Sequence, residues 1–173
     1  LLVKKQMEKN DLYFHADIQG AAHCILKEGK EKASMKDKKE AAIFAGVLSK
    51  AWQARLASID VYSVLPEQVS KKAQSGESLG AGAFMIYGQR EWFKKIPLEF
   101  WIGINEEGIV ISGPLNAVKK QAKVFALIEE GNESKAELAK KLRGIFEKKT
   151  GIKTSLDELI AMLPGEGRIK NTG

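Results

Sequence analysis

The sequence predicts an α+β protein, in which a mixed or antiparallel sheet packs on a long central helix and is followed by a small α/β extension. Two observations predict the first part. Short β-prone runs flank an alanine-rich segment, and that segment, from Ser34 to about Ala57, has no proline and one glycine. The extension is predicted because strand-like and helix-like segments alternate near the C-terminal end. We therefore expect an N-terminal unit over residues 1–104 and an extension over residues 105–173.

The composition is that of a globular protein with a real core. Of its 173 residues, 44% are hydrophobic and 29% are charged. No apolar run approaches the roughly 20 residues that span a bilayer, so we expect no membrane partner and a cytoplasmic protein. The single cysteine, Cys24, excludes an internal disulfide and is expected to be a buried structural thiol.

The first elements are short strands. The chain starts on Leu-Leu-Val-Lys-Lys without a methionine, which we interpret as a fragment whose first strands are missing. Residues 12–16 and 22–27 are β-prone and are separated by a turn. A lysine-rich, charged stretch over residues 27–40 is expected to be a solvated loop that leads into a helix.

Ser34 followed by Asp37 has the spacing of a helix N-cap. From there to about residue 57, apolar side chains form a broad stripe that includes Phe44, Leu48 and Trp52. So broad a stripe predicts a central helix that packs deep against a sheet, with Trp52 in the core.

The next segment combines a strand, a long loop and a second strand. Residues 59–65 are β-prone, residues 66–82 contain three glycines and two adjacent lysines, and residues 83–87 form an apolar run. Such a loop suits an anion such as a phosphate, with charge from Lys71, Lys72 and Arg90. Its glycines match neither the phosphate-loop pattern nor the dinucleotide-binding pattern, so the sequence does not support nucleotide hydrolysis.

The extension is predicted from alternating patterns. Capping residues Ser134 and Ser155 mark the starts of its last two helices. The elements expected are strands at 98–104, 108–113 and 123–128, helices at 114–121, 134–149 and 155–164, and a frayed tail at 165–173.

One cluster resembles a metal or acid–base site. His15 and Asp17 project to the same side of a strand, and a turn could bring His23 beside them. The sequence offers no further His or Cys ligand set. Structural or RNA-contacting histidines are the preferred interpretation, with a metal-dependent phosphodiesterase as the alternative. We expect no enzyme activity and no cofactor.

The charged and aromatic residues indicate a polyanion as partner only if they cluster on one face of the molecule. The formal net charge is +6, with acidic residues also plentiful. Trp92 and Phe93 lie between charged residues, an arrangement typical of base stacking and equally of packing at a sheet edge.

Three separated blocks carry a family resemblance. These are DLYFHADIQGA at 11–21, the helix EAA…SKAWQAR at 40–55, and QVSKKAQSGESLGAGAFMIYG at 68–88. In this order and spacing they resemble the NFACT-R domain of the NFACT proteins, over about residues 1–104. The remainder is similar to the C-terminal extension of archaeal members. The chain departs from the family pattern at Tyr87, where a basic residue is common.

The resemblance implies a ribosome quality-control factor. Members of the family bind obstructed large ribosomal subunits that carry peptidyl-tRNA, and they recruit tRNA. The implied partners are tRNA, the large ribosomal subunit and the other domains of the full-length factor. The family pattern falls on His15, Asp17, Gly20, Gln68, Val69, Ser70, Lys71, Gly76, Glu77, Gly82, Phe84, Met85, Ile86 and Gly88.

These lines of reasoning converge on an RNA-binding module that holds phosphates in its Gly/Ser/Lys loop. The alternative is a protein-interaction module that docks the factor on its own other domains or on a ribosomal protein, with Trp92, Phe93 and the extension as its surface. The expected RNA-binding residues are His15, Asp17, Gln68, Ser70, Lys71, Lys72, Ser75, Gly76, Glu77, Gly82 and Arg90.

Overall fold

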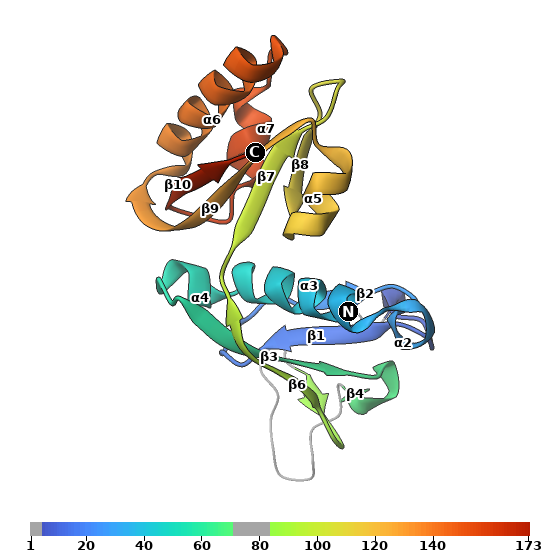
Figure 1. Ribbon diagram of the computed structural model, residues 1–173. Coiled ribbons are helices and arrows are strands. Elements are labelled where there is room, and N and C mark those ends of the chain that lie inside the picture. The colour runs from blue at the N-terminus through green and yellow to red at the C-terminus, as the bar shows by residue number, and fades with distance from the viewer. Residues whose placement is uncertain (1–4, 71–83) are drawn as a thin grey trace.

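The computed structural model describes residues 5–70 and 84–173, and it confirms the α+β prediction (Figure 1). Two four-stranded sheets, both antiparallel, contain most of the strands. We call them the N-terminal sheet and the C-terminal sheet. The N-terminal sheet has the order β2 (Cys24–Leu26), β1 (Leu12–Ala16), β3 (Ser58–Val64) and β6 (Glu91–Pro97). The C-terminal sheet has the order β10 (Gly167–Thr172), β9 (Val124–Glu133), β7 (Phe100–Ile104) and β8 (Val110–Gly113).

Helix α3 (Met35–Val47) covers one face of the N-terminal sheet. It begins at the predicted cap, where the Ser34 hydroxyl accepts the N–H of Asp37 and the Asp37 carboxylate accepts the N–H of Ser34 at 2.8 Å. Its inward side chains are small, and Ala42 and Ala45 are fully buried. Small side chains let the helix approach the sheet closely.

The prediction of one helix to about residue 57 is wrong, since α3 ends at Val47. The Ser49 hydroxyl donates to the Gly46 carbonyl at 2.6 Å and accepts the N–H of Ala51 at 3.1 Å. It thereby caps a separate short helix, α4 (Lys50–Gln53). Serine competes for backbone hydrogen bonds in this way, which favours caps over helix interiors. Trp52 in α4 is buried, as predicted.

Three helices accompany the C-terminal sheet: α5 (Leu115–Gln121), α6 (Lys135–Thr150) and α7 (Leu156–Met162). All three lie where the sequence predicts helices. Helix α6 begins at a capping box between Ser134 and Glu137 and ends at Gly151, which has a φ of 72°. Its buried side chains Leu138 and Phe146 pack into the core.

The predicted frayed tail is wrong. Residues 167–172 form β10, which pairs with β9 in an antiparallel register that a bulge interrupts. The two strands approach closely at a pair of glycines. A Cβ added to Gly131 would lie 2.5 Å from the backbone of Gly167, and one added to Gly167 would lie 2.7 Å from the Glu129 carbonyl. The absence of side chains at both positions allows this pairing.

The chain passes from one sheet to the other between β6 and β7, and α3 lies between the N-terminal sheet and the C-terminal half (Figure 1). The two halves are in direct contact. The indole N–H of Trp52 donates to the Glu166 carbonyl at 2.9 Å, and the Asn116 amide donates to the Glu40 carboxylate. Buried apolar residues of both halves belong to one hydrophobic cluster.

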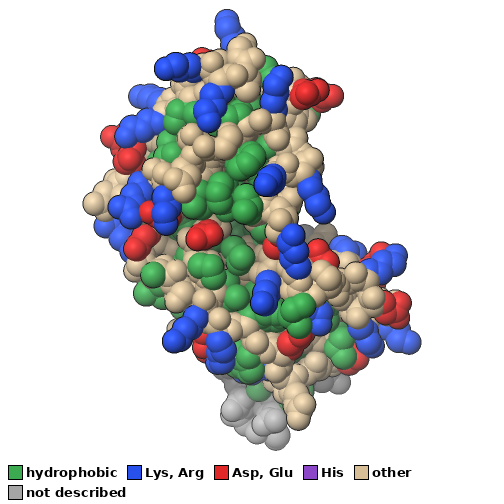
Figure 2. All heavy atoms as spheres, in the orientation of Figure 1, with side chains coloured by type: hydrophobic (Ala, Val, Ile, Leu, Met, Phe, Trp, Pro, Cys, Tyr) green, Lys and Arg blue, Asp and Glu red, His purple; other side chains and the backbone are tan. Residues whose placement is uncertain are grey.

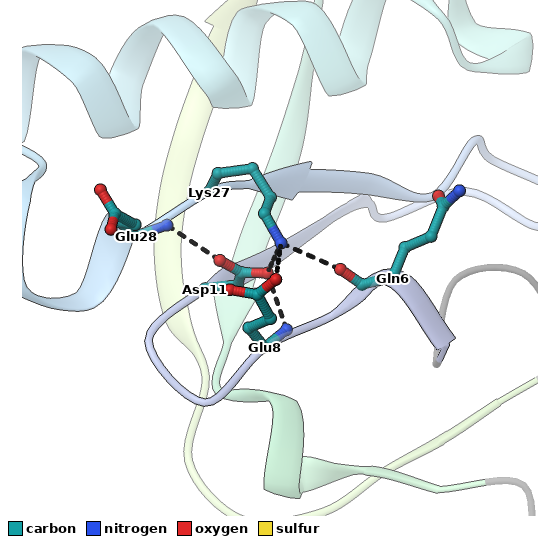
Figure 3. Close-up of polar contacts among 5 residues, drawn as sticks. All are labelled: Gln6, Glu8, Asp11, Lys27 and Glu28. Carbon is teal, nitrogen blue, oxygen red and sulfur yellow. Dashed lines mark hydrogen bonds and ion pairs between the residues drawn. The ribbon is translucent and has the colours of Figure 1, made fainter.

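A buried carboxylate holds the segment before β1 against the end of β2 (Figure 3). Asp11 is fully buried and accepts the Lys27 ammonium at 2.7 Å and the backbone N–H groups of Glu8 and Glu28 at 2.8 and 2.9 Å. The Lys27 ammonium also donates to the Gln6 carbonyl at 3.0 Å. This cluster fixes the start of β1, whose side chains line the candidate site.

On the face shown in Figure 2, lysine and arginine side chains occur over both halves and are interspersed with acidic ones. The net charge therefore does not point to one site on this face. No helix in the described ranges is long and apolar enough to cross a membrane.

Candidate nucleic-acid interface

The N-terminal sheet carries aromatic side chains on the face opposite α3. Side chains alternate along a strand, so Phe14 of β1 faces the core beside α3, whereas Tyr13 and His15 face the other way. In the strand register, His15 lies opposite Tyr62 of β3, and Tyr62 lies opposite Trp92 of β6. We call these three residues, with Tyr13 and His23, the aromatic face.

The rings of the aromatic face form a continuous series of contacts. His15 and Tyr62 have ring centroids 5.8 Å apart, and Tyr62 and Trp92 meet edge to face at 5.3 Å. His23 contacts His15 at 5.6 Å, and its Nδ1 shares a 2.5 Å hydrogen bond with the Tyr13 hydroxyl. Tyr13 and Tyr62 are buried beneath, while 37% of Trp92 is exposed. Solvent therefore reaches the series at Trp92, on an edge strand of the sheet, and also at His23, which is exposed.

Two cations lie over these rings. The Arg90 guanidinium is 4.7 Å from the Tyr62 ring centroid and 6.0 Å from that of Trp92. The Lys94 ammonium lies 4.1 Å from the Trp92 centroid. Lys94 is also held by Asp60, which accepts its ammonium at 2.9 Å and the N–H of Lys95 at 2.8 Å. These contacts place two positive charges at one end of the aromatic face.

The ends of the predicted phosphate-binding loop lie beside this face. β4 (Val69–Ser70) and β5 (Met85–Ile86) form a two-stranded antiparallel sheet. Val69, Phe84 and Ile86 pack in one cluster with Tyr13 and Tyr62. The Phe84 ring also meets the His23 ring edge-on at 5.1 Å. The segments that flank the loop and the aromatic face thus belong to one region of the molecule.

Gln68 acts as a brace in this region. It ends the 3₁₀ turn η1 (Pro66–Gln68), where its side-chain oxygen accepts the N–H of Leu65 at 2.9 Å. Its amide nitrogen donates to the carbonyls of Tyr87 and Gln89, both at 2.7 Å. Gln68 therefore joins the segments before and after the loop, directly next to Arg90.

The other predicted contacts differ in their surroundings. His15 is half-buried within the aromatic face, and Arg90 lies over it. Asp17 is exposed at the end of β1, and Ser70 lies in β4 where the loop begins. The remaining predicted residues lie outside the described ranges: Lys71, Lys72, Ser75, Gly76, Glu77 and Gly82.

Sequence reasoning missed Tyr62 and Lys94, and it left the role of Trp92 open. A local signal existed. Val61 and Phe93 point into the core, so the alternation of a strand places their neighbours Tyr62 and Trp92 on the opposite face. Because Phe93 is buried, the predicted Trp92–Phe93 surface is wrong for Phe93.

Burial keeps the rings of His15 and Tyr62 neutral near pH 7. Burial, followed by the charge of His23, lowers the pKa of His15. Burial raises the pKa of Tyr62, which Arg90 partly opposes. The positive charge beside these two rings comes from the Arg90 guanidinium and the Lys94 ammonium. Neutral rings beside cations suit stacking with a base whose phosphates lie nearby.

The histidines of the aromatic face contact rings rather than a cluster of ligands. Within residues 5–70 and 84–173, no group of three His, Cys, Asp or Glu side chains could hold a metal ion. Cys24 is half-buried, and burial raises the pKa of its thiol to about 11. At neutral pH this thiol is protonated and is a poor nucleophile.

The structure is an α+β protein whose N-terminal sheet carries an aromatic face with two cations over it. Comparison with known proteins identifies the family. The family model of the NFACT protein RNA-binding domain matches residues 1–88, which is half of the chain, so the chain belongs to this family. The resemblance seen in the three sequence blocks is confirmed.

Individual relatives extend this result. Over 170 residues, which are 96% of this chain and 25% of the relative, the chain is 35% identical to the archaeal Rqc2 homologue aRqcH of Methanocaldococcus jannaschii. It is 36% identical over 105 residues, 60% of this chain and 10% of the relative, to the ribosome quality control complex subunit NEMF homologue of Drosophila melanogaster. The chain thus spans a quarter or less of these two relatives.

A solved structure of the C-terminal part of the fibronectin/fibrinogen-binding protein from Streptococcus suis also resembles the chain. It has 23% sequence identity and a TM-score of 0.45, and the match covers 56% of this chain and 35% of that one.

Proposed function

We propose that this chain is the RNA-binding module of a cytoplasmic ribosome quality-control factor, and that it contacts tRNA or ribosomal RNA of stalled large subunits. The family description names RNA binding, and the relatives are named as ribosome quality-control proteins. The observation that carries the proposal is the placement of Arg90, held over Tyr62 where the chain returns from the loop. The module acts by binding and not by catalysis.

The binding chemistry follows from the residue types. Lys71, Lys72 and Arg90 supply charge to phosphates, and backbone N–H groups between Ser75 and Gly82 hold phosphate oxygens. Arg90 is partly ordered before RNA arrives, because its guanidinium already lies on a ring, so less side-chain entropy is lost on binding.

The remaining predicted residues have supporting roles. His15, Asp17 and Ser70 border the site, and Gly76 and Gly82 allow the backbone to approach RNA closely. From the sequence, we expect Glu77 to brace the loop rather than to touch RNA. Gln68 fixes the two segments that flank the loop.

The test is binding of labelled tRNA to the chain across a salt series, beside the variant Lys71→Ala/Lys72→Ala/Arg90→Ala. A matched control, Lys119→Ala/Lys120→Ala/Lys123→Ala, removes the same charge from the other half of the molecule. Losing three phosphate contacts is expected to lower the slope of log affinity against log salt by about 2–3. The control is expected to retain most of the slope.

Two results would contradict the proposal: no binding of tRNA even at low salt, or equal losses in the variant and the control. The first result would favour a protein-interaction module that docks the factor on its own domains or on a ribosomal protein, and the second would show binding through net charge and not at the loop.

A further inference from the structure

We propose that the row His15–Tyr62–Trp92 is a stacking site for an unpaired nucleobase, so that the chain takes a single-stranded segment of RNA at this face. The inference rests on the proposed function, since it assumes that RNA is the ligand. It adds a second contact to the phosphate-binding loop. The loop would hold the backbone, and the row would select RNA whose bases are free.

The strand register builds this site. His15, Tyr62 and Trp92 lie directly opposite one another on three neighbouring strands, which aligns their rings across the sheet. Tyr62 is buried and contacts both neighbours, so it supports the row from within. Trp92 stands at the open end, on an edge strand of the described sheet. A base that stacks there would cover exposed surface of Trp92, a residue that is 37% exposed.

Charge around the row indicates where the backbone of the RNA would run. Arg90 and Lys94 lie at the Trp92 end, close enough to contact phosphates on either side of a stacked base. The acidic neighbours at that end are paired, Asp60 with Lys94 and Glu91 with Lys38 at 3.0 Å. The repulsion of phosphate by these carboxylates is therefore reduced.

The His15 end of the row carries a negative charge instead of positive ones. Asp17 is exposed beside His15, and its charge acts on both His15 and Tyr62. A carboxylate repels phosphate, so we expect the backbone to stay at the Arg90 and Lys94 end while the base points along the row.

A duplex does not fit this site. Bases inside an A-form helix present only their edges, whereas stacking on the exposed Trp92 ring requires an unstacked base with a free face. Single strands offer such faces, and aromatic platforms bind them with little dependence on sequence. The chemistry therefore favours unpaired RNA over duplex RNA of equal charge.

The experiment measures affinity and tryptophan fluorescence of the 173-residue chain with four RNA probes: ten- and twenty-nucleotide oligouridylate, an abasic ten-mer with the same phosphates as the shorter one, and a ten-base-pair duplex whose charge the longer one nearly matches. The variants are Trp92→Leu, the conservative Trp92→Phe, and Trp101→Leu, which makes the same chemical change in β7 of the other sheet. Circular dichroism checks that each variant is folded.

Oligouridylate is expected to quench Trp92 fluorescence and the abasic ten-mer is not, because only the former has bases to stack. Trp92→Leu should weaken oligouridylate binding by about 5- to 150-fold, the range that corresponds to loss of one stacked base. Trp92→Phe should lose less, and Trp101→Leu should bind as the unmodified chain does.

The inference is overturned if the abasic ten-mer and ten-nucleotide oligouridylate bind equally, if the duplex binds tighter than twenty-nucleotide oligouridylate, or if Trp92→Leu has no effect. In each of these cases the salt-dependent binding of tRNA can persist, so the proposed function would stand. Loss of all RNA binding by the unmodified chain would instead reject the proposed function itself.

Discussion

Asp11 contributes to stability through its hydrogen bonds rather than through charge alone. Burial by itself raises the pKa of this carboxyl, but the hydrogen bonds from Lys27 and from the N–H groups of Glu8 and Glu28 outweigh it, and the net pKa is lowered. A lowered pKa in the folded state means that the ionised form stabilises the fold. This contribution is present above the ordinary pKa of 3.8 and is lost as the pH falls through the folded-state value.

We expect Asp11→Asn to lower the free energy of unfolding by about 1.5–3 kcal/mol, the range for hydrogen bonds to a buried charged group. An amide cannot accept three donors as a carboxylate does. Urea unfolding at pH 7 measures the effect, with Glu106→Gln, an exposed carboxylate in a turn, as the control. Equal unfolding midpoints for the two variants would refute the role of Asp11.

His15 predicts a loss of stability at a higher pH than Asp11 does. Its pKa lies below the ordinary value of 6.5 because the ring is buried and lies near His23. The unfolded chain therefore binds more protons than the folded chain just below pH 6.5, and stability should fall as the pH drops through this region. NMR titration should show His15 titrating below 6.5 and its pKa rising in His23→Gln. An unchanged pKa would exclude coupling between the two rings.

At the scale of elements, the sequence predicts the features that depend on residues close together in the chain. The N-caps at Ser34, Ser134 and Ser155 were identified correctly, because a cap depends on residues three positions apart. The break between α3 and α4 is not predicted. The residue pattern favours a continuous helix, but the Ser49 hydroxyl hydrogen-bonds to backbone groups on both sides of the break.

The aromatic face illustrates the limit of such reasoning. Alternation within a strand predicts on which side Tyr62 and Trp92 lie, but their alignment with His15 depends on the register of three strands that are distant in sequence. β10 was missed for the same reason, because its pairing requires Gly131 to meet Gly167.

This close approach can be tested with two alanine substitutions of opposite expected sign. Gly131→Ala places a Cβ within 2.5 Å of the backbone of Gly167, so it should destabilise the protein by about 1–3 kcal/mol, as overpacking does. Gly144→Ala is the matched control, because Gly144 lies inside α6 and its added Cβ meets nothing within 4 Å. It should stabilise the protein by roughly 0.5–1 kcal/mol. Thermal unfolding measures both, and a neutral Gly131→Ala would contradict the pairing.

At the scale of the whole molecule, the two sheets share one hydrophobic cluster and are joined at Trp52. The division at residue 104 stays a prediction. Since β7 pairs within the C-terminal sheet, we propose that the boundary falls between β6 and β7. The shared core further implies that the two sheets stabilise each other, so neither is expected to unfold alone.

The three tryptophans allow this cooperativity to be measured directly. Trp92 lies in the N-terminal sheet, Trp101 in the C-terminal sheet and Trp52 at their contact. In a chain labelled with 5-fluorotryptophan, the three ¹⁹F signals should lose intensity at one common urea concentration. Trp52→Ala should lower that concentration for both remaining signals, because removing a buried tryptophan costs about 3–5 kcal/mol. Separate midpoints for Trp92 and Trp101 in the unmodified chain would show that the two sheets fold independently, and the chain would then have to be treated as two domains.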